Sequence, residues 1–152
     1  MPVVEPAELR SLVPMGESYM ALDVGTKTIG IAVSDVSHMI ASPRETIRRT
    51  KLSKDVVRLQ EIVAADSVGG LVVGLPVSMD GSEGPRCQAT RDITAEIMKV
   101  LDLPVAFWDE RLSTAAVERV LIEGADASRK RRGEVIDKMA AGWILQGFLD
   151  GG

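Results

Sequence analysis

A single carboxylate inside an apolar strand is the residue of this chain best suited to chemistry. Asp23 lies between Leu22 and Val24, just before a turn that begins at Gly25. A carboxylate held among apolar side chains loses hydration, so it stays charged only where a cation or several donors compensate it. The alternative is a strand-end aspartate that accepts hydrogen bonds from the following turn. Asp23 is therefore the first candidate for a functional site.

Three further carboxylates could join Asp23. Asp109 and Glu110 close the apolar run 105–108, which we expect to be a parallel strand whose carboxyl end lies where open sheets bind ligands. Asp137 lies in the last predicted helix, and two alanines three and four positions further on would let that helix approach the sheet. Oxygen donors without His or Cys suit Mg²⁺ or Mn²⁺. The alternatives are a solvated turn at 109–111 and an ion pair between Asp137 and a basic neighbour.

The composition excludes several other chemistries. The chain holds one cysteine, Cys87, and one histidine, His38, so an internal disulfide and a Cys/His zinc site are both excluded. A thiol nucleophile with a histidine partner and a Ser/His/Asp triad are disfavoured for the same reason. We expect His38 to be a surface turn residue.

Length and charge place the chain among single-domain soluble proteins. Its 152 residues fit one domain, and its longest apolar run, 70–75, is too short to span a bilayer. The first residues lack the basic start and apolar stretch of a secretory signal, so we expect a cytoplasmic protein. A net charge of −4 is unusual for a protein that binds a polyanion.

Hydrophobic periodicity predicts an alternating order of strands and helices. Strands are expected at 19–24, 28–35, 40–48, 70–75 and 104–109. Helices are expected from a cap at Ser53 to about residue 66, from Pro85 to about 101, from a cap at Ser113 to 124, and from about 134 to 149. This order implies an α/β fold with a mixed sheet and helices on both faces.

Local basic clusters could nevertheless hold phosphates. One stretch carries basic residues at 44, 48, 49, 51, 54 and 58, and a second, 129–132, precedes the helix of Asp137. The glycine-rich loop 79–84 offers backbone donors near the strand ends. Alternatively, these segments are solvated loops. Trp108 and Trp143 are expected in the core, so we expect recognition of backbone and shape. The candidate nucleic-acid-binding residues are Lys27, Arg129, Lys130, Arg131, Arg132, Gly81 and Ser82.

Four segments together resemble the YqgF family, also called RuvX, of RNase H-like nucleases, which are related to the Holliday-junction resolvase RuvC. The segments are ALDVGTKTIGIAVSD (21–35), VVGLPVSMDGSEG (72–84), DERLST (109–114) and IDKMAAGWIL (136–145). They occur in the family's order, and the resemblance covers about residues 19–149. It implies an N-terminal extension at 1–18 and an RNase H-like domain at 19–150, with a five-stranded sheet whose first three strands are antiparallel.

The resemblance also implies an activity, a cofactor and partners. The activity is metal-dependent hydrolysis of phosphodiester bonds in 5′-end processing of the 16S ribosomal RNA precursor. Carried over residue by residue, the catalytic and metal-binding residues are Asp23, Glu110 and Asp137, with Asp109 as a helper and Mg²⁺ or Mn²⁺ as the cofactor. Two ions bridged by Asp23 would act on the substrate. The partners would be structured RNA or branched DNA, bound by a monomer or homodimer.

One departure from the resolvase pattern leaves alternatives open. RuvC places a glutamate at the end of the strand that matches 70–75, whereas this strand ends in Leu75 and Pro76. Glu110, from the neighbouring strand, would substitute for that glutamate. The alternatives are a resolvase of Holliday-type DNA junctions, a non-catalytic nucleic-acid-binding module, and an ATP-binding protein of the actin and sugar-kinase superfamily, for which one domain is too short.

Overall fold

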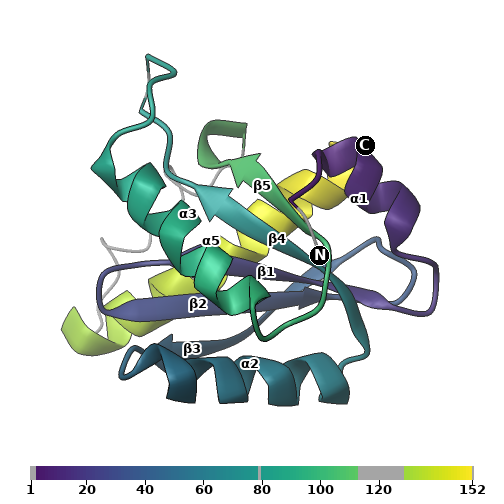
Figure 1. Ribbon diagram of the computed structural model, residues 1–152, viewed down its shortest axis with the longest axis horizontal. Coiled ribbons are helices and arrows are strands. Elements are labelled where there is room, and N and C mark those ends of the chain that lie inside the picture. Colours follow the sequence, from purple (N-terminus) through teal and green to yellow (C-terminus); the bar gives the residue numbers. More distant parts are fainter. Residues whose placement is uncertain (1–2, 79, 113–128, 152) are drawn as a thin grey trace.

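Five strands form one mixed sheet in the order β3-β2-β1-β4-β5 (Figure 1). The computed structural model describes residues 3–78, 80–112 and 129–151, with side chains from residue 138 onward in the last range. The strands are β1 (Ser18–Val24), β2 (Thr28–Ser34), β3 (Ala41–Arg48), β4 (Val68–Leu75) and β5 (Val105–Asp109). The pairs β1–β2 and β2–β3 are antiparallel, and β1–β4 and β4–β5 are parallel. The predicted fold class is confirmed.

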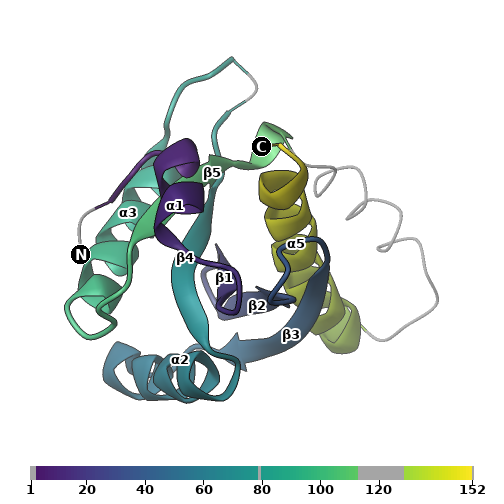
Figure 2. The ribbon, with the colours of Figure 1, turned by 90° about the vertical axis from the view of Figure 1, so that its right-hand side faces the viewer.

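Helices cover both faces of this sheet. They are α1 (Pro6–Leu12), α2 (Leu52–Ala65), α3 (Pro85–Met98) and α5 (Arg129–Asp150), and a short 3₁₀ turn, η1 (Glu110–Leu112), follows β5. Figure 2 shows α5 on one side of the sheet and α2 and α3 on the other. Within the described ranges, no helix is long and apolar enough to cross a membrane.

Each face has its own apolar core because alternate residues of a strand point to opposite faces. Along β1, Met20, Leu22 and Val24 join the cluster under α2 and α3. Tyr19 and Ala21 join the cluster under α5, which also contains Val72, Ala141, Ile144 and Phe148. The central strand is therefore buried from both sides, as its continuous burial pattern shows.

The segment before β1 contributes to the core. Pro6 stands in the first turn of α1, where its missing N–H costs nothing, and Leu9 is fully buried. Leu9 and Val13 pack on β4 at Gly70, where a Cβ would lie 3.1 Å from Leu9 Cδ1 and 2.7 Å from Val13 Cγ2. Gly70 thus lets α1 approach the sheet. The division into an extension and a domain at residue 18 stays a prediction.

Two predicted helix starts are wrong, and one predicted helix cannot be compared. Ser53 does not cap α2, because the helix begins one residue earlier and the buried Asp55 carboxylate instead accepts bonds from the Thr50 N–H and hydroxyl. The last helix begins at Arg129 rather than near 134. The helix predicted from Ser113 to 124 lies outside the described residues.

The burial of Leu9 predicts a test of the α1 contact. Leu9→Ala should lower the free energy of unfolding by about 2–5 kcal/mol, because it leaves a cavity against Gly70 and Val13. Urea unfolding measures this value. The matched control is Leu12→Ala, since Leu12 is 47% exposed on the same helix and should change stability by less than about 0.5 kcal/mol. Equal effects of the two variants would show that α1 is not part of the core.

Candidate functional site

Asp23 lies on the α5 face of the sheet, with no side chain beside it on either neighbouring strand. It follows Ala21 by two positions, so strand alternation puts it on the face of the α5 cluster. Its partner on β2 is Gly30. Leu22 pairs with Val73 of β4, and one residue further along this register Asp23 is level with Gly74. Asp23 is 8% exposed, so this side chain is largely shielded from water.

Glu110 reaches the same place from β5. It is the first residue of η1, directly after the strand ends. A Cβ on Gly74 would lie 3.3 Å from Glu110 Cγ and 2.5 Å from Ile144 Cδ1 of α5. The side chains of Glu110 and Ile144 therefore both lie over Gly74, beside Asp23. The structure thus places two of the predicted acidic residues on one face of the sheet, on β1 and after β5, the strands on either side of β4.

Asp137 belongs to α5, but its side chain lies outside the described residues. The helix places position 137 four residues before Ala141 and seven before Ile144, and both of these residues are buried against the sheet. Convergence of Asp137 with Asp23 and Glu110 therefore stays a prediction. Among the side chains that the structure does describe, no three His, Cys, Asp or Glu groups form a metal-binding cluster.

Asp109 is held away from this pair by Arg111. Its neighbour Trp108 packs in the α5 cluster, so Asp109 points to the opposite face, where it lines a cavity of about 360 Å³ with Phe107 and Arg111. Its carboxylate accepts bonds from Arg111 Nε at 3.0 Å and Nη2 at 2.7 Å, and from the Arg111 backbone N–H. These bonds hold the pKa of Asp109 below its usual range. The structure does not bring Asp109 together with Asp23.

The loop of Gly81 and Ser82 uses its backbone donors internally. The Gly81 N–H donates to the Ser78 carbonyl at 2.8 Å, and the Ser82 N–H donates to Asp80 Oδ1 at 2.9 Å. Gly81 has a φ of +90°, which an L side chain rarely adopts. The loop is therefore an ordered turn in which these two N–H groups are not available to a phosphate.

The basic candidates lie in three places, and two of the arginines form ion pairs with carboxylates. Lys27 is exposed in the β1–β2 turn, at the end of the sheet where Asp23 lies. Arg44 pairs with Asp66 at 3.0 Å, and Arg58 forms two hydrogen bonds with Glu45, so these two cations of the first stretch are neutralised. The second cluster, residues 129–132, is the first turn of α5 rather than a loop before it, and its side chains lie outside the described residues.

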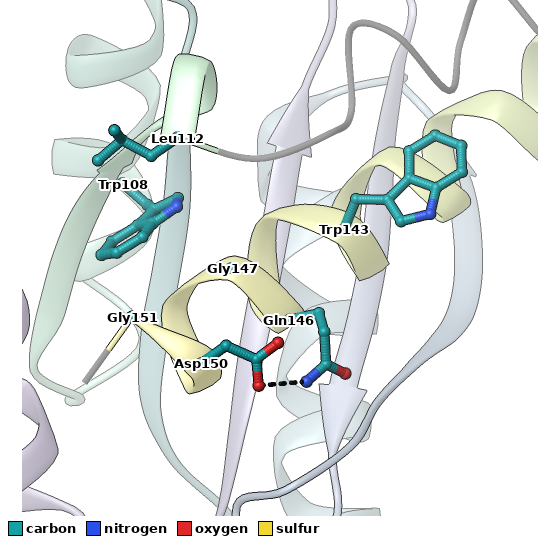
Figure 3. A pocket seen from close by; sticks show the side chains of 7 residues that line it. All are labelled: Trp108, Leu112, Trp143, Gln146, Gly147, Asp150 and Gly151. Atoms are coloured by element: carbon teal, nitrogen blue, oxygen red, sulfur yellow. Dashed lines mark hydrogen bonds between the residues drawn. The ribbon is translucent and has the colours of Figure 1, made fainter.

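The two tryptophans differ in their surroundings. Trp108 is 9% exposed and packs edge-on against Phe148 with ring centroids 5.9 Å apart, so its predicted core position is confirmed. Trp143 is only partly buried. Both line a cavity of about 540 Å³ beside η1, and in Figure 3 the indole ring of Trp143 points away from Trp108. The predicted core position of Trp143 is therefore wrong.

Sequence reasoning missed Gly30, Gly74 and Arg111. A glycine inside an apolar strand indicates close approach of another group, and that signal was present at both glycines. Arg111 follows two carboxylates in the same segment, which indicates a local pair. His38 lies in the turn after β2, where its Nε2 contacts the Glu17 carbonyl at 2.6 Å, in agreement with the predicted structural role.

The sequence and the fold are both similar to those of known proteins. A sequence model described as "RuvX: Holliday junction resolvase" matches residues 17–151. A protein of Paramagnetospirillum magneticum named "Putative pre-16S rRNA nuclease" is 57% identical over 99% of this chain and 96% of its own length. A protein of the same name from Caulobacter vibrioides is 51% identical over 99% of this chain and 97% of its own. The fold is similar to that of Thermus thermophilus RuvC in complex with a Holliday junction, with a TM-score of 0.55, 12% identity, and coverage of 89% of this chain and 95% of RuvC.

The Asp109–Arg111 pair predicts a shift that NMR can measure. Arg111→Gln should raise the pKa of the Asp109 carboxyl toward its ordinary value, because the two guanidinium bonds are lost. In the native protein the pair stabilises the fold above the ordinary carboxyl pKa, and this contribution disappears as pH falls through the lowered pKa. A carboxyl ¹³C titration follows Asp109 directly. The control is Lys99→Gln, which removes the partner of Glu96 near the C-terminal end of α3 and should leave the Asp109 pKa unchanged. An unchanged Asp109 pKa in Arg111→Gln would contradict the assignment.

Proposed function

This chain belongs to the RuvX family, and from that premise we propose that it is a divalent-metal-dependent nuclease that processes the 5′ end of the 16S ribosomal RNA precursor. Relatives that match almost the full chain carry the name "Putative pre-16S rRNA nuclease". The RuvC-like fold supports hydrolysis of phosphodiester bonds.

The observation that carries this proposal is the meeting of Asp23 and Glu110 around Gly74. These residues come from segments far apart in the sequence, yet register and contact put them on one face, at the two strands that flank β4. Asp23 is largely buried, and carboxylates that share one face of a sheet are donors that a divalent cation can bind. A bound cation would offset the repulsion between the two carboxylates.

The donors fit a hard divalent cation. Both side chains offer carboxylate oxygens, the donors that Mg²⁺ and Mn²⁺ favour. Gly30 and Gly74 carry no side chain of their own beside Asp23, and the Glu110 side chain lies over Gly74. We propose that Asp23, Glu110 and Asp137 hold the metal, with Asp137 supplied by α5.

In this mechanism the protein contributes carboxylates that hold the metal and basic side chains that bind the substrate, all at fixed positions. When bound, divalent metal supplies an activated water and stabilises the charge that develops on the phosphate. Asp23, fixed near the carboxyl end of a buried strand, would not have to reorganise during the reaction. Lys27 at the β1–β2 turn and Arg129, Lys130, Arg131 and Arg132 at the start of α5 are proposed to bind backbone phosphates.

A four-way DNA junction is the second candidate substrate. The family description names a Holliday junction resolvase, and RuvC, whose fold this chain shares, was solved with such a junction. The two substrates differ in their backbone sugar and geometry but require the same hydrolysis. Parallel cleavage assays therefore separate them.

The acidic pair predicts the effect of isosteric substitutions. Asp23→Asn and Glu110→Gln should each lower the cleavage rate at least about a hundredfold, since several kcal/mol of metal-derived stabilisation would be lost. The assay compares Mg²⁺- or Mn²⁺-dependent cleavage of precursor ribosomal RNA and of a four-way DNA junction. Circular dichroism should remain native-like.

The control for these variants is Asp92→Asn, an exposed carboxylate on α3 that should keep the wild-type rate. A wild-type cleavage rate in Asp23→Asn at matched metal concentration would show that Asp23 only accepts hydrogen bonds from the turn that follows it. Absence of cleavage of either substrate by the wild type, with RNA binding intact, would favour the non-catalytic binding module.

The basic turn of α5 predicts a change in salt dependence. Replacing Arg129, Lys130, Arg131 and Arg132 with alanine should weaken RNA binding and flatten the slope of log affinity against log salt by about 0.7 for each lost phosphate contact. Alanine preserves the helix, so metal affinity should change little. Fluorescence anisotropy at several salt concentrations measures the slope. An unchanged slope would mean that another surface binds the nucleic acid.

A further inference from the structure

Two arginines without a carboxylate partner line a small cavity at the β1–β2 turn. Arg49 follows β3, and Arg86 lies in the first turn of α3. In the part of the chain that the structure describes, neither guanidinium forms an ion pair, whereas Arg44, Arg58, Arg91 and Arg111 each do. Two uncompensated cations in one cavity repel each other, so the cavity favours an anion.

Arg49 is fixed in place by the turn. Its Nη1 donates to the Gly25 carbonyl at 2.7 Å, and its backbone N–H donates to the Lys27 carbonyl at 2.8 Å. The backbone bond fixes the position of Arg49, and the Nη1 bond holds one end of the guanidinium at the turn. Its Nε and Nη2 groups make no hydrogen bond to any residue in the described ranges, so they remain as donors. A pre-oriented guanidinium fork matches the geometry of a phosphate.

One face of α3 forms the opposite wall. Arg86, Ala89, Thr90 and Ile93 recur at the spacing of a single helix face, and all four line the cavity with Val24, Gly25 and Thr26. Arg86 is exposed, so its side chain is free to close over a ligand. The small side chain of Ala89 leaves the space between the arginines open.

The size of the cavity limits the ligand. Its volume is about 60 Å³, which is far below the roughly 300 Å³ or more of a typical small-molecule site. A nucleobase or nucleoside does not fit, whereas one tetrahedral anion does. The ligand class is therefore a phosphate group.

We propose that Arg49 and Arg86 form a subsite for a backbone phosphate of the nucleic acid, one other than the phosphate that is cleaved. This inference rests on the proposed function. The cavity includes Val24, the residue after Asp23, so it lies at the same end of β1 as the acidic pair but on the opposite face. A strand that crosses this end of the sheet places one phosphate at Asp23 and another between the arginines. The subsite positions the substrate and takes no part in the chemical step.

RNA binding without metal tests the subsite separately from catalysis. In EDTA, Arg86→Ala should weaken binding of a short single-stranded RNA about three- to tenfold at low salt and reduce the salt slope by about one. Arg49→Lys keeps the charge but loses the fork, so it should also weaken binding while retaining the fold. Lys99→Ala removes one positive charge at the other end of α3 and should bind as the wild type does. Fluorescence anisotropy measures all four proteins.

Inorganic phosphate separates a backbone subsite from a site for free anions. Phosphate should shift the Nε–Hε NMR signals of Arg49 and Arg86 and compete with RNA in the wild type. Wild-type affinity in both Arg86→Ala and Arg49→Lys, or no RNA binding by the wild type, would overturn the proposal. Phosphate shifts without any effect of the variants on RNA binding would also overturn it and assign a free-anion site.

Cleavage kinetics distinguish failure of this inference from failure of the proposed function. Arg86→Ala should raise KM and leave kcat within about twofold, since the lost contact acts equally on bound substrate and transition state. A fall in kcat at unchanged KM would contradict a positioning role. A different outcome is that the wild type cleaves neither substrate while Arg86→Ala and Arg49→Lys still bind RNA more weakly than the wild type without metal. In that case the subsite stands and the nuclease proposal fails.

Discussion

The close approach of α5 to the sheet is the constraint on which the site depends. Ile144 lies so near β4 that a Cβ at Gly74 would be 2.5 Å from its Cδ1. This packing shields Asp23 from bulk water and limits where Glu110 can lie. An apolar cover leaves few water dipoles to solvate charge below it, so any group of opposite charge acts strongly there. The same contact thus completes the core and sets the electrostatic surroundings of Asp23.

The sequence predicts the elements better than it predicts their juxtaposition. Alternation along β1 is enough to assign Asp23 to one face, because Ala21 and Leu22 point to different clusters. The position of Asp23 next to Gly74 depends on the register between β1 and β4. These strands are distant in sequence, so local patterns do not encode their register. Convergence of the acidic residues came from family resemblance and stays a prediction, although Asp23 and Glu110 lie on the same face of the sheet.

Errors in the predicted helices have local physical causes. Ser53 matched a cap pattern, but the buried Asp55 carboxylate makes stronger bonds to Thr50. Gly133 disfavours a helix interior, which moved the predicted start of α5 too far along the chain. The sequence also does not predict that Arg49 and Arg86 line one cavity, because they come together only in the folded chain.

The contact between α1 and α5 links folding to the order of synthesis. Arg10 Nη2 donates to the Phe148 carbonyl at 2.8 Å, and Leu9 shares a cluster with Phe148, so the first helix made packs on the last. While the ribosome still holds the C-terminal residues, β1 has no cover on that face, and Asp23 remains open to water. The packing that shields Asp23 therefore forms only after the segment of α5, residues 129–150, has been synthesised.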